Sequence, residues 1–305
     1  MSDTKQTNVV AVVVTYNKPQ LLQLCVSAIL NQTYPVNRVL VIDNGGLEDT
    51  RKVIEQLADD KISHVLTGEN LGGAGGFKFG INAGMDHSAD FLWVMDDDTV
   101  PDLSALSAMM EANSTLQSDG INPGFLSSNV RWTDMAPAKM NIPGVAEDWS
   151  YEVRPGLVKL TWASFVSLLI NTEAINKVGL PIDAYFIWGD DVEYSRRIST
   201  SFPSFFVQDS IAVHHMDANV GANILEEKNK NRVSRYYFAV RNELHTVREL
   251  GTKSELMRVV SKDLAQVFKV MGTGFTGKKI AVTIRGFFAG LFFNPRIDFH
   301  KSNGQ

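Results

Sequence analysis

Cysteine is almost absent from this 305-residue chain. Cys25 is its only cysteine, which excludes an intramolecular disulfide and any zinc site built from several cysteines. Because Cys25 stands in an apolar stretch, we expect a small buried hydrophobe rather than a reactive thiol, in a reducing compartment. No run reaches the ~18 to 20 apolar residues of a membrane-spanning helix, and residues 1–8 lack the apolar core of a signal peptide. These absences predict a cytoplasmic protein.

The charges are divided unevenly along the chain: the first part has few basic residues relative to acidic ones, and the last part has few acidic residues relative to basic ones. Residues 225–305 contain 15 Lys and Arg against 7 Asp and Glu, whereas residues 1–224 contain 14 against 27. The basic residues of this tail stand beside aliphatic and Phe clusters rather than among base-stacking aromatics, which argues against a nucleic-acid partner. An anionic membrane surface or a lipid-linked ligand fits the tail better. Contact between copies of the chain, as a homo-oligomer, is the alternative.

Short apolar strands alternate with helical patterns in the first hundred residues. Strands are expected at 9–14, 38–42, 62–66 and 91–95, and polar residues follow each of them directly. In an open parallel α/β sheet the carboxyl ends of the strands meet at one edge, where ligands bind. The pattern therefore predicts a Rossmann-like, mostly parallel sheet flanked by helices, with its site at that edge.

The second half of the chain is less regular. Residues 131–156 are expected to form a long loop, 161–170 a buried strand followed by a helix near Glu173, and the segment before His214 and His215 a strand pair. From residue 225 onward the pattern predicts only helices, with an amphipathic one at 255–271. We therefore divide the chain into an α/β domain, 1–224, and a basic helical extension, 225–305.

The strongest local signal for chemistry is an aspartate triplet that directly follows the fourth strand. Asp96, Asp97 and Asp98 repel one another, and a hard divalent cation is the simplest way to offset that cost. Alternation along an extended segment places Asp96 and Asp98 on one side, so we assign these two to a metal. The alternative is a solvated acidic turn that caps the next helix, although a cap needs only one carboxylate.

A second signal is a glycine run before a helical stretch. Four glycines in Gly72–Gly76 permit close backbone approach and leave amide groups free for an anion. The run is neither a dinucleotide-binding fingerprint nor a P-loop. A flexible turn explains it equally well.

A third signal is the acidic segment Trp188–Glu193, which opens another helix. One of its carboxylates is a candidate general base beside an aromatic platform for a sugar ring. Helix capping is the alternative, since the helix dipole favours acidic residues there. His214 and His215 end a strand, where alternation lets only one ring face the ligand edge and complete a carboxylate site. A nucleotide pocket, a metal, an anion site and a base are what a nucleotide-sugar transferase needs.

Residues 8–217 resemble the inverting family 2 glycosyltransferases of the GT-A fold, and within them the bacterial galactofuranosyltransferases and related rhamnosyltransferases. The segments that carry the resemblance are VVTYN at 13–17, VIDN at 41–44, NLGGAGGF at 70–77, the aspartate triplet, and FIWGDDVEY at 186–194.

The resemblance implies a role for each matching position. The nucleotide-sugar contacts would be Thr15, Tyr16, Asn17, Asp43, Asn70, Gly73, Gly76 and Asp97. Asp96, Asp98 and His214 (or His215) would hold Mn²⁺ or Mg²⁺. Asp191 would be the base, with Asp190 as its rival, and Trp188 and Asp190 would shape the acceptor site. The tail matches enzymes that rest on the inner membrane face, where lipid-linked glycan acceptors reside.

Three hypotheses follow. The first is a galactofuranosyltransferase that uses UDP-galactofuranose to extend a lipid-linked polysaccharide, such as an O antigen of the cell envelope. The second keeps the scaffold with dTDP-rhamnose or another donor, because a few pocket contacts decide the sugar. The third is a non-catalytic glycan- or lipid-binding module. The triplet, Asp191 and a histidine in one chain argue against the third.

Overall fold

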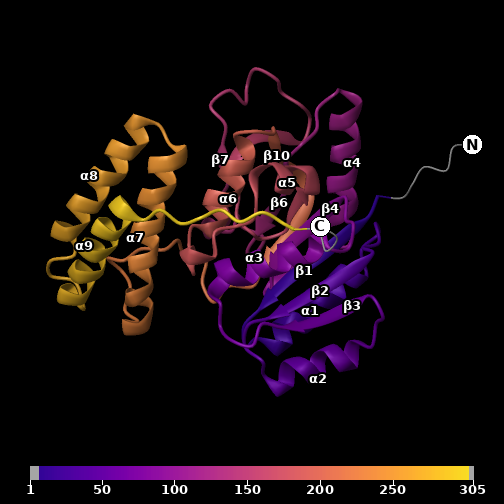
Figure 1. Ribbon diagram of the computed structural model, residues 1–305, viewed down its shortest axis with the longest axis horizontal. Coiled ribbons are helices and arrows are strands. Elements are labelled where there is room, and N and C mark those ends of the chain that lie inside the picture. Colours follow the sequence, from indigo (N-terminus) through magenta and orange to yellow (C-terminus); the bar gives the residue numbers. More distant parts are fainter. Residues whose placement is uncertain (1–6, 302–305) are drawn as a thin grey trace, which may run out of the picture.

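The computed structural model describes residues 7–301, so residues 1–6 of the polar amino terminus lie outside the described residues. One mixed, mostly parallel sheet forms the centre of the molecule (Figure 1). In spatial order its strands are β3 (Ile62–Leu66), β2 (Arg38–Asp43), β1 (Val9–Thr15), β4 (Phe91–Asp96), β9 (Leu168–Asn171), β6 (Phe125–Arg131), β10 (Ser204–His214), β8 (Leu157–Trp162) and β7 (Gly144–Val145), and β5 (Thr99–Pro101) pairs with β10. The first four strands in this order run parallel, so their carboxyl ends meet at one edge, as predicted.

Helices cover both faces of this sheet. They are α1 (Pro19–Leu30), α2 (Glu48–Leu57), α3 (Gly72–Met85), α4 (Ala105–Ser118), α5 (Thr172–Val178) and α6 (Asp190–Ser199), with short 3₁₀ turns η1 (Lys139–Asn141) and η2 (Asp183–Tyr185). Strand β1 shows why two layers form. Val9, Ala11 and Val13 pack with α1 and α4, whereas Val10 and Val12 pack with α3 and α6. Successive side chains of β1 thus alternate between the two cores on either face of the sheet. Both cores are apolar because the strand is buried on both faces.

The glycine run lies inside helix α3 rather than in a loop before it. A Cβ atom on Gly76 would lie 2.7 Å from Val14 Cγ1, and one on Gly80 would lie 2.5 Å from Val12 Cγ1. The spacing of four residues puts these glycines on one face, so the helix backbone approaches β1 closely. The glycines therefore serve packing first, whereas the sequence had suggested an anion site or a flexible turn.

Three other expectations for the second half need correction. The strand expected at 161–170 is interrupted at 163–167, which separates β8 from β9. The expected strand pair before the histidines is the single strand β10, which carries an irregularity between Val207 and Ile211. The expected loop 131–156 contains η1 and β7. Interruptions and irregularities of strands, and very short strands, depend on how a segment pairs with its neighbours. Hydrophobic periodicity therefore does not predict them.

Helices α7 (Lys230–Leu250), α8 (Lys253–Lys269) and α9 (Thr276–Phe292) form a group at one end of the molecule (Figure 1). Gly286 and Gly290 let α9 lie against α7, because a Cβ on Gly290 would come within 2.9 Å of the Arg241 carbonyl oxygen. In the part of the chain that the structure describes, no helix is long and apolar enough to cross a membrane.

The chain beyond α9 is not helical, which corrects the prediction of helices only. It runs back from the helical group across the α/β body, as the yellow segment in Figure 1 shows. The Leu180 amide donates to the Asp298 carbonyl oxygen at 2.7 Å, and Lys78 of α3 pairs with the Asp298 carboxylate at 2.5 Å. The helical group is therefore attached to the body at both ends of its sequence.

Candidate active site

A cavity of about 250 Å³ lies at the carboxyl ends of β1, β2 and β3. Its walls include Tyr16, which is 50% exposed, Asp43, Asn70 and the glycines of the turn after β2. Asn70 Oδ1 accepts a hydrogen bond from the Gly72 amide at 2.9 Å and so fixes the turn into α3. Asn17, with a φ of 59°, stands against Gly45 of the same rim. Four of the predicted nucleotide contacts thus meet around one cavity.

Two predicted nucleotide contacts have other partners. Thr15 is completely buried, and its hydroxyl donates to Asp97 Oδ2 at 2.7 Å, so the predicted contact of Thr15 with a nucleoside does not fit its position. Asp43 Oδ1 accepts from the Gly45 and Gly46 amides at 2.8 Å each, and Asp43 Oδ2 lies 3.1 Å from His64 Nε2. Asp43 therefore shapes the cavity wall with both carboxylate oxygens already engaged.

Two aspartates of the triplet form ion pairs with one lysine. Lys18 Nζ lies 2.6 Å from Asp98 Oδ2 and 3.8 Å from Asp97 Oδ1. Burial, followed by the charges of its two neighbours, raises the pKa of Asp96 well above its usual range. Burial would also raise the pKa of Asp98, but His214 and Lys18 lower it to about 2, so Asp98 is ionised at neutral pH. Strand β4 ends at Asp96, so Asp97 and Asp98 lie in a turn where strand alternation does not apply.

His214 and His215 occupy different places. His214 Nε2 lies 3.1 Å from Asp98 Oδ1, and His214 Nδ1 lies 2.8 Å from Asn141 Oδ1. His215 meets the same aspartate only through its backbone amide, which donates to the Asp98 carbonyl oxygen at 2.8 Å. Because Asn141 Oδ1 is an acceptor, it holds the His214 proton on Nδ1, and Nε2 is directed at Asp98. Of the two histidine side chains, His214 is the one beside the triplet.

The Asp98 and His214 pair has the chemistry of a divalent metal site. Asp98 Oδ1 is buried without a hydrogen-bond partner within residues 7–301, although His214 Nε2 is close. A doubly protonated imidazole suits this contact, and so do a neutral imidazole and a carboxylate that share a cation. No group of three His, Cys, Asp or Glu side chains among the described residues has a metal-binding arrangement. The residues thus fit two ligands, and Asp96 is not brought into a three-ligand group.

The predicted phosphate contacts of the glycine run differ from each other. Gly76 is buried, because a Cβ there would also lie 2.6 Å from Asn44 Nδ2, so its predicted contact with a diphosphate does not fit. Gly73 faces open space in the first turn of α3. Gly72 has a φ of +71°, and a Cβ there would lie 2.1 Å from the Phe186 carbonyl oxygen. The start of α3 therefore packs directly on the segment that leads to the acidic motif.

Asp190 and Asp191 begin helix α6, and their carboxyl groups differ in acidity. Burial, with the Asp191 charge, raises the pKa of Asp190 to about 8. Burial raises the pKa of Asp191 to about 6, against backbone hydrogen bonds that lower it. Asp191 is therefore the more readily ionised at neutral pH, which suits a general base. Asp190 also raises the pKa of Asp96, so the two acidic motifs lie within electrostatic range of each other.

Trp188 lies between the acidic motif and the helical group. Its ring centroid is 5.1 Å from that of Tyr236 on α7, and it packs beside Ile224 and Val233. The half-buried indole thus forms part of the contact between the α/β body and the helices. Its predicted role as a sugar platform stays a prediction.

Sequence reasoning missed several residues of this site. Lys18 lies in the loop that follows the first strand, and a cation there was the available signal for a partner of the triplet. Asn141, His64 and Asn242 had no such signal, because they reach the site from separate segments and form no motif.

Fold and site together define a class, an α/β protein with an acidic turn at the carboxyl edge of its sheet. The family model described as "Glycosyl transferase family 2" matches residues 10–174, more than half of the chain. The chain belongs to glycosyl transferase family 2.

Curated relatives agree with this assignment. "Galactofuranosyltransferase GlfT1" of Mycolicibacterium smegmatis is 27% identical over 208 residues, 63% of this chain and 66% of that protein. The protein of the same name from Mycobacterium tuberculosis is 28% identical over 203 residues, 64% of this chain and 65% of that protein. "Glycosyltransferase AglE" of Haloferax volcanii is 26% identical over 212 residues, 67% and 65% of the two chains. The chain thus matches about 65% of the length of these relatives.

A solved structure has the same fold. "Crystal structure of GalNAc-T7 with UDP, GalNAc and Mn2+" superposes with a TM-score of 0.58 at 13% sequence identity, covering 81% of this chain and 48% of that one. At this identity the likeness concerns the fold alone. It confirms the predicted GT-A type of α/β fold.

Proposed function

We propose that this glycosyltransferase transfers galactofuranose from UDP-galactofuranose to a hydroxyl group of a lipid-linked glycan, with inversion at the anomeric carbon. The observation that carries the proposal is the match to relatives named galactofuranosyltransferase over 208 and 203 residues. The convergence of the aspartate triplet and the Asp190–Asp191 pair at one edge of the sheet supports it.

The donor nucleoside is assigned to the cavity beside Tyr16. The exposed Tyr16 ring offers a stacking surface, and Asn17 and Asn70 supply polar groups at the rim. The diphosphate is assigned to the first turn of α3, where Gly73 leaves open space and the helix amides favour an anion. Asp97 closes the floor between them through its bonds to Thr15 and to the Tyr16 amide at 3.1 Å.

Catalysis is assigned to Asp191. Its carboxylate takes the proton from the acceptor hydroxyl as that oxygen attacks the anomeric carbon, and the bond from this carbon to the diphosphate oxygen breaks. Asp190, whose raised pKa keeps it protonated at neutral pH, donates rather than accepts a hydrogen bond in the acceptor site. Asp98 and His214 would hold Mn²⁺ or Mg²⁺, and the ion would supply positive charge for the departing diphosphate. The solved neighbour named with Mn²⁺ supports a divalent metal.

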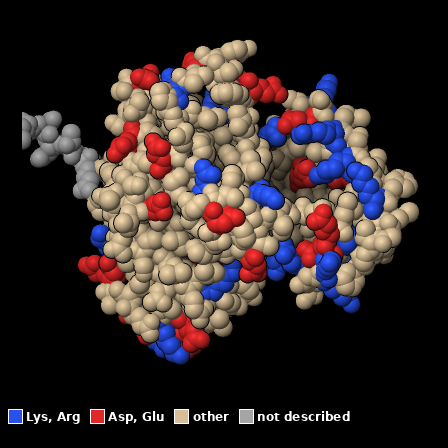
Figure 2. Space-filling view, turned by 180° about the vertical axis from the view of Figure 1, so that it is seen from behind, with Lys and Arg blue, Asp and Glu red and all other residues tan. Residues whose placement is uncertain are grey.

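The helical region, residues 225–305, is assigned to an anionic membrane face, which makes the enzyme a peripheral protein at the inner surface. Exposed large hydrophobics recur along α8, the turn after it and α9, namely Met257, Leu264, Phe268, Met271, Ile284, Phe288, Leu291 and Phe292. Figure 2 shows many Lys and Arg over this end of the molecule, at the right of the view, with Asp and Glu among them. Apolar side chains beside cations are what an interfacial helix presents to anionic lipid.

The test of this function is turnover of a panel of nucleotide sugars. We expect hydrolysis or transfer with UDP-galactofuranose and Mn²⁺, and loss of activity with EDTA. UDP-galactopyranose, UDP-glucose and dTDP-rhamnose are the competing donors, and turnover of one of these instead would overturn the assigned sugar. Full activity in the presence of EDTA would contradict the proposed dependence on a divalent metal.

A pair of neighbouring histidines tests the metal site itself. His214→Gln is expected to weaken Mn²⁺ binding at least ~10-fold. Loss of a group that only hydrogen-bonds to a metal ligand typically costs ~10- to 100-fold in metal affinity, and loss of the ligand itself should cost no less. His215→Gln is the matched control, because its side chain does not lie beside Asp98. Calorimetric titration with Mn²⁺ measures both, and equal affinities would contradict the assignment of His214.

A further inference from the structure

The segment that leads into the acidic motif has an unusual backbone. Phe186 has φ 62° and ψ −56°, Trp188 has φ 64°, and Gly189 has φ 85° immediately before α6. A residue other than glycine in such a conformation costs ~1–3 kcal/mol, so this turn persists only where its surroundings hold it. Asp190 and Asp191 follow within two residues, so their positions depend on the turn.

One asparagine of α7 binds most of this turn. Asn242 is completely buried, and its Nδ2 donates to the carbonyl oxygens of Tyr185 at 3.1 Å, Ile187 at 3.2 Å and Trp188 at 2.7 Å. Gly189 lies directly on it, since a Cβ there would be 3.5 Å from Asn242 Cβ. Carbonyl groups in a turn lack the regular hydrogen bonds of a helix or a sheet. The side-chain amide of Asn242 supplies hydrogen bonds to these three carbonyl groups instead.

Arg241 supports this amide from the neighbouring position. Its Nε and Nη2 donate to Asn242 Oδ1 at 2.9 and 2.8 Å, which directs the amide nitrogen at the turn. Arg241 Nη2 also donates to the Ala184 carbonyl oxygen at 2.6 Å, and the guanidinium lies 4.0 Å from the Phe293 ring centroid. The oxygen of Asn242 is therefore saturated by Arg241, and its nitrogen is left for the turn.

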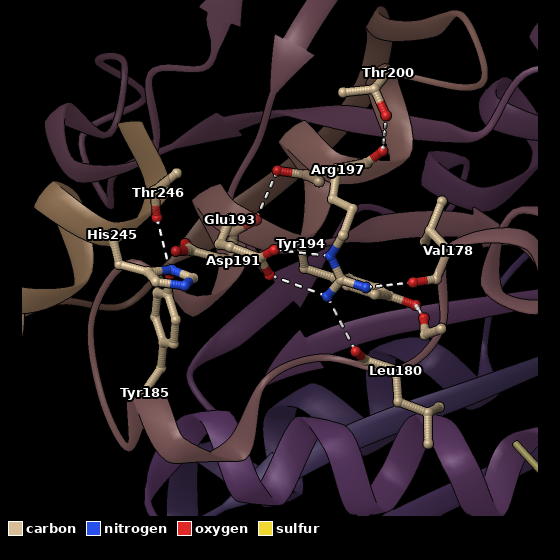
Figure 3. Close-up of polar contacts among 12 residues, drawn as sticks. Val178, Leu180, Tyr185, Asp191, Glu193, Tyr194, Arg197, Thr200, His245 and Thr246 are labelled. Carbon is tan, nitrogen blue, oxygen red and sulfur yellow. Dashed lines mark hydrogen bonds and ion pairs between the residues drawn. The ribbon is translucent and has the colours of Figure 1, made fainter. Parts of the chain in front are cut away.

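The same face of α7 holds the start of the turn through Tyr185. The Tyr185 hydroxyl lies 2.7 Å from His245 Nδ1 and 2.9 Å from Thr246 Oγ1, and Figure 3 shows it enclosed between these two residues. Burial lowers the pKa of His245 to about 4, so its ring is neutral and its Nδ1 shares a hydrogen bond with the hydroxyl. Residues 241, 242, 245 and 246 share one side of the helix by their spacing.

We propose that Asn242, oriented by Arg241, is a positioning residue of the transfer reaction: it fixes the turn 185–189 so that Trp188, Asp190 and Asp191 face the acceptor. It touches neither substrate and acts through Asp191, so the inference rests on the proposed function. The helical region is on this account a part of the catalytic unit as well as a membrane contact. The nucleotide cavity lies at the other strands and does not depend on this amide.

The test compares two asparagines of α7. Asn242→Ala is expected to lower kcat ~10- to 100-fold and to raise the acceptor KM, because the acidic motif is displaced. The Kd for uridine should change less than ~2-fold, because the residues 185–189 do not line the nucleoside cavity. Asn229→Ala is the matched control: Asn229 Oδ1 caps the same helix by accepting from the Asn231 amide at 2.9 Å, far in sequence from the turn contacts. Its kcat and acceptor KM should stay within ~2-fold of the wild type.

Hydrogen exchange gives a readout that needs no turnover. Amides 185–191 should exchange at least ~10-fold faster in Asn242→Ala and at the wild-type rate in Asn229→Ala. Unchanged exchange and kinetics in Asn242→Ala would overturn the proposal, and so would equal losses in both variants, which would show a general effect of helix stability. Should Asn242→Ala fail to fold, Tyr185→Phe removes only the hydroxyl anchor and is expected to lower kcat ~3- to 10-fold. Retained activity in Asp191→Asn would overturn the proposed base alone, whereas the exchange result would still decide on Asn242.

Discussion

Two adjacent carboxyl groups at the start of α6 illustrate how local burial divides chemical roles. Asp190 is buried and its pKa is raised to about 8, whereas that of Asp191 is raised only to about 6, since backbone amides stabilise its charged form. The sequence places both residues in one motif and leaves either as the base. Their different surroundings favour Asp191, because a base must be ionised at the working pH.

This difference predicts the effect of single substitutions. Asp191→Asn should lower kcat by the ~10²- to 10⁴-fold typical of a lost general base, with the Kd for UDP unchanged. Asp190→Asn keeps a neutral side chain of the same shape and should lower kcat by less than ~10-fold. Steady-state kinetics with UDP titrations measure both. The assignment is reversed if Asp190→Asn is the slower enzyme.

A pH dependence follows from the same groups. Asp191 acts as a base in its ionised form. The ratio kcat/KM for the acceptor should therefore be highest above the pKa of Asp191 and should fall as the pH drops through about 6. Burial also raises the pKa of Asp97 to about 6, so the acidic limb contains both groups. An activity that stays constant from pH 7 to pH 5 would contradict the role of Asp191.

Helix α3 shows what a sequence pattern conveys at the scale of an element. Its glycines were interpreted as a phosphate loop or as turns, and they form one face of a helix that packs on β1. The choice could not be made from the sequence, because glycine serves close approach to a ligand and to another backbone equally. What remains for a ligand is the first turn, at Gly73.

Two glycine variants of α3 should change stability in opposite directions. Gly80→Ala places a Cβ 2.5 Å from Val12 Cγ1 and should destabilise the fold by ~1–3 kcal/mol through overpacking. Gly73→Ala meets open space and should stabilise it by ~0.5–1 kcal/mol, since alanine loses less entropy in a helix. Urea unfolding measures both. A neutral Gly80→Ala variant would show that α3 does not need this close approach.

Helix α6 combines a chemical and a structural role. Glu193 and Arg197 form a buried ion pair with Nε–Oε1 at 2.7 Å, and Arg197 continues to the Leu180 carbonyl oxygen at 3.0 Å (Figure 3). Such a pair is typical of a fixed element, because loss of either partner leaves a buried charge. The helix that carries Asp191 is thus held by its own second turn as well as by α7.

At the scale of the whole molecule, the helical group has two surfaces with different partners. Its inner face binds the turn before α6, and its outer face exposes aromatic and aliphatic side chains. A truncation before α7 would therefore disturb the catalytic turn as well as any membrane contact. Point substitutions on the outer face separate the two roles.

Vesicle binding tests the outer face. Phe268→Asp, combined with Phe288→Asp, should lower cosedimentation with phosphatidylglycerol vesicles at least ~10-fold, because it replaces exposed apolar surface by charge that anionic lipid repels. Tyr151→Asp is the control, an aromatic residue that is 88% exposed in the α/β body. Binding that equals the wild type in the double variant, or a change of oligomeric state instead, would assign this face to contacts between copies of the chain.

The sequence alone determined the alternating strands and helices, the edge at which the acidic turns meet, and the family, because hydrophobic periodicity and ordered motifs are local properties of the chain. The tertiary structure decided which histidine lies beside Asp98, that Thr15 faces Asp97, and that Asn242 holds the turn before α6. These contacts join residues that are distant in sequence, and they depend on side-chain directions that only packing fixes.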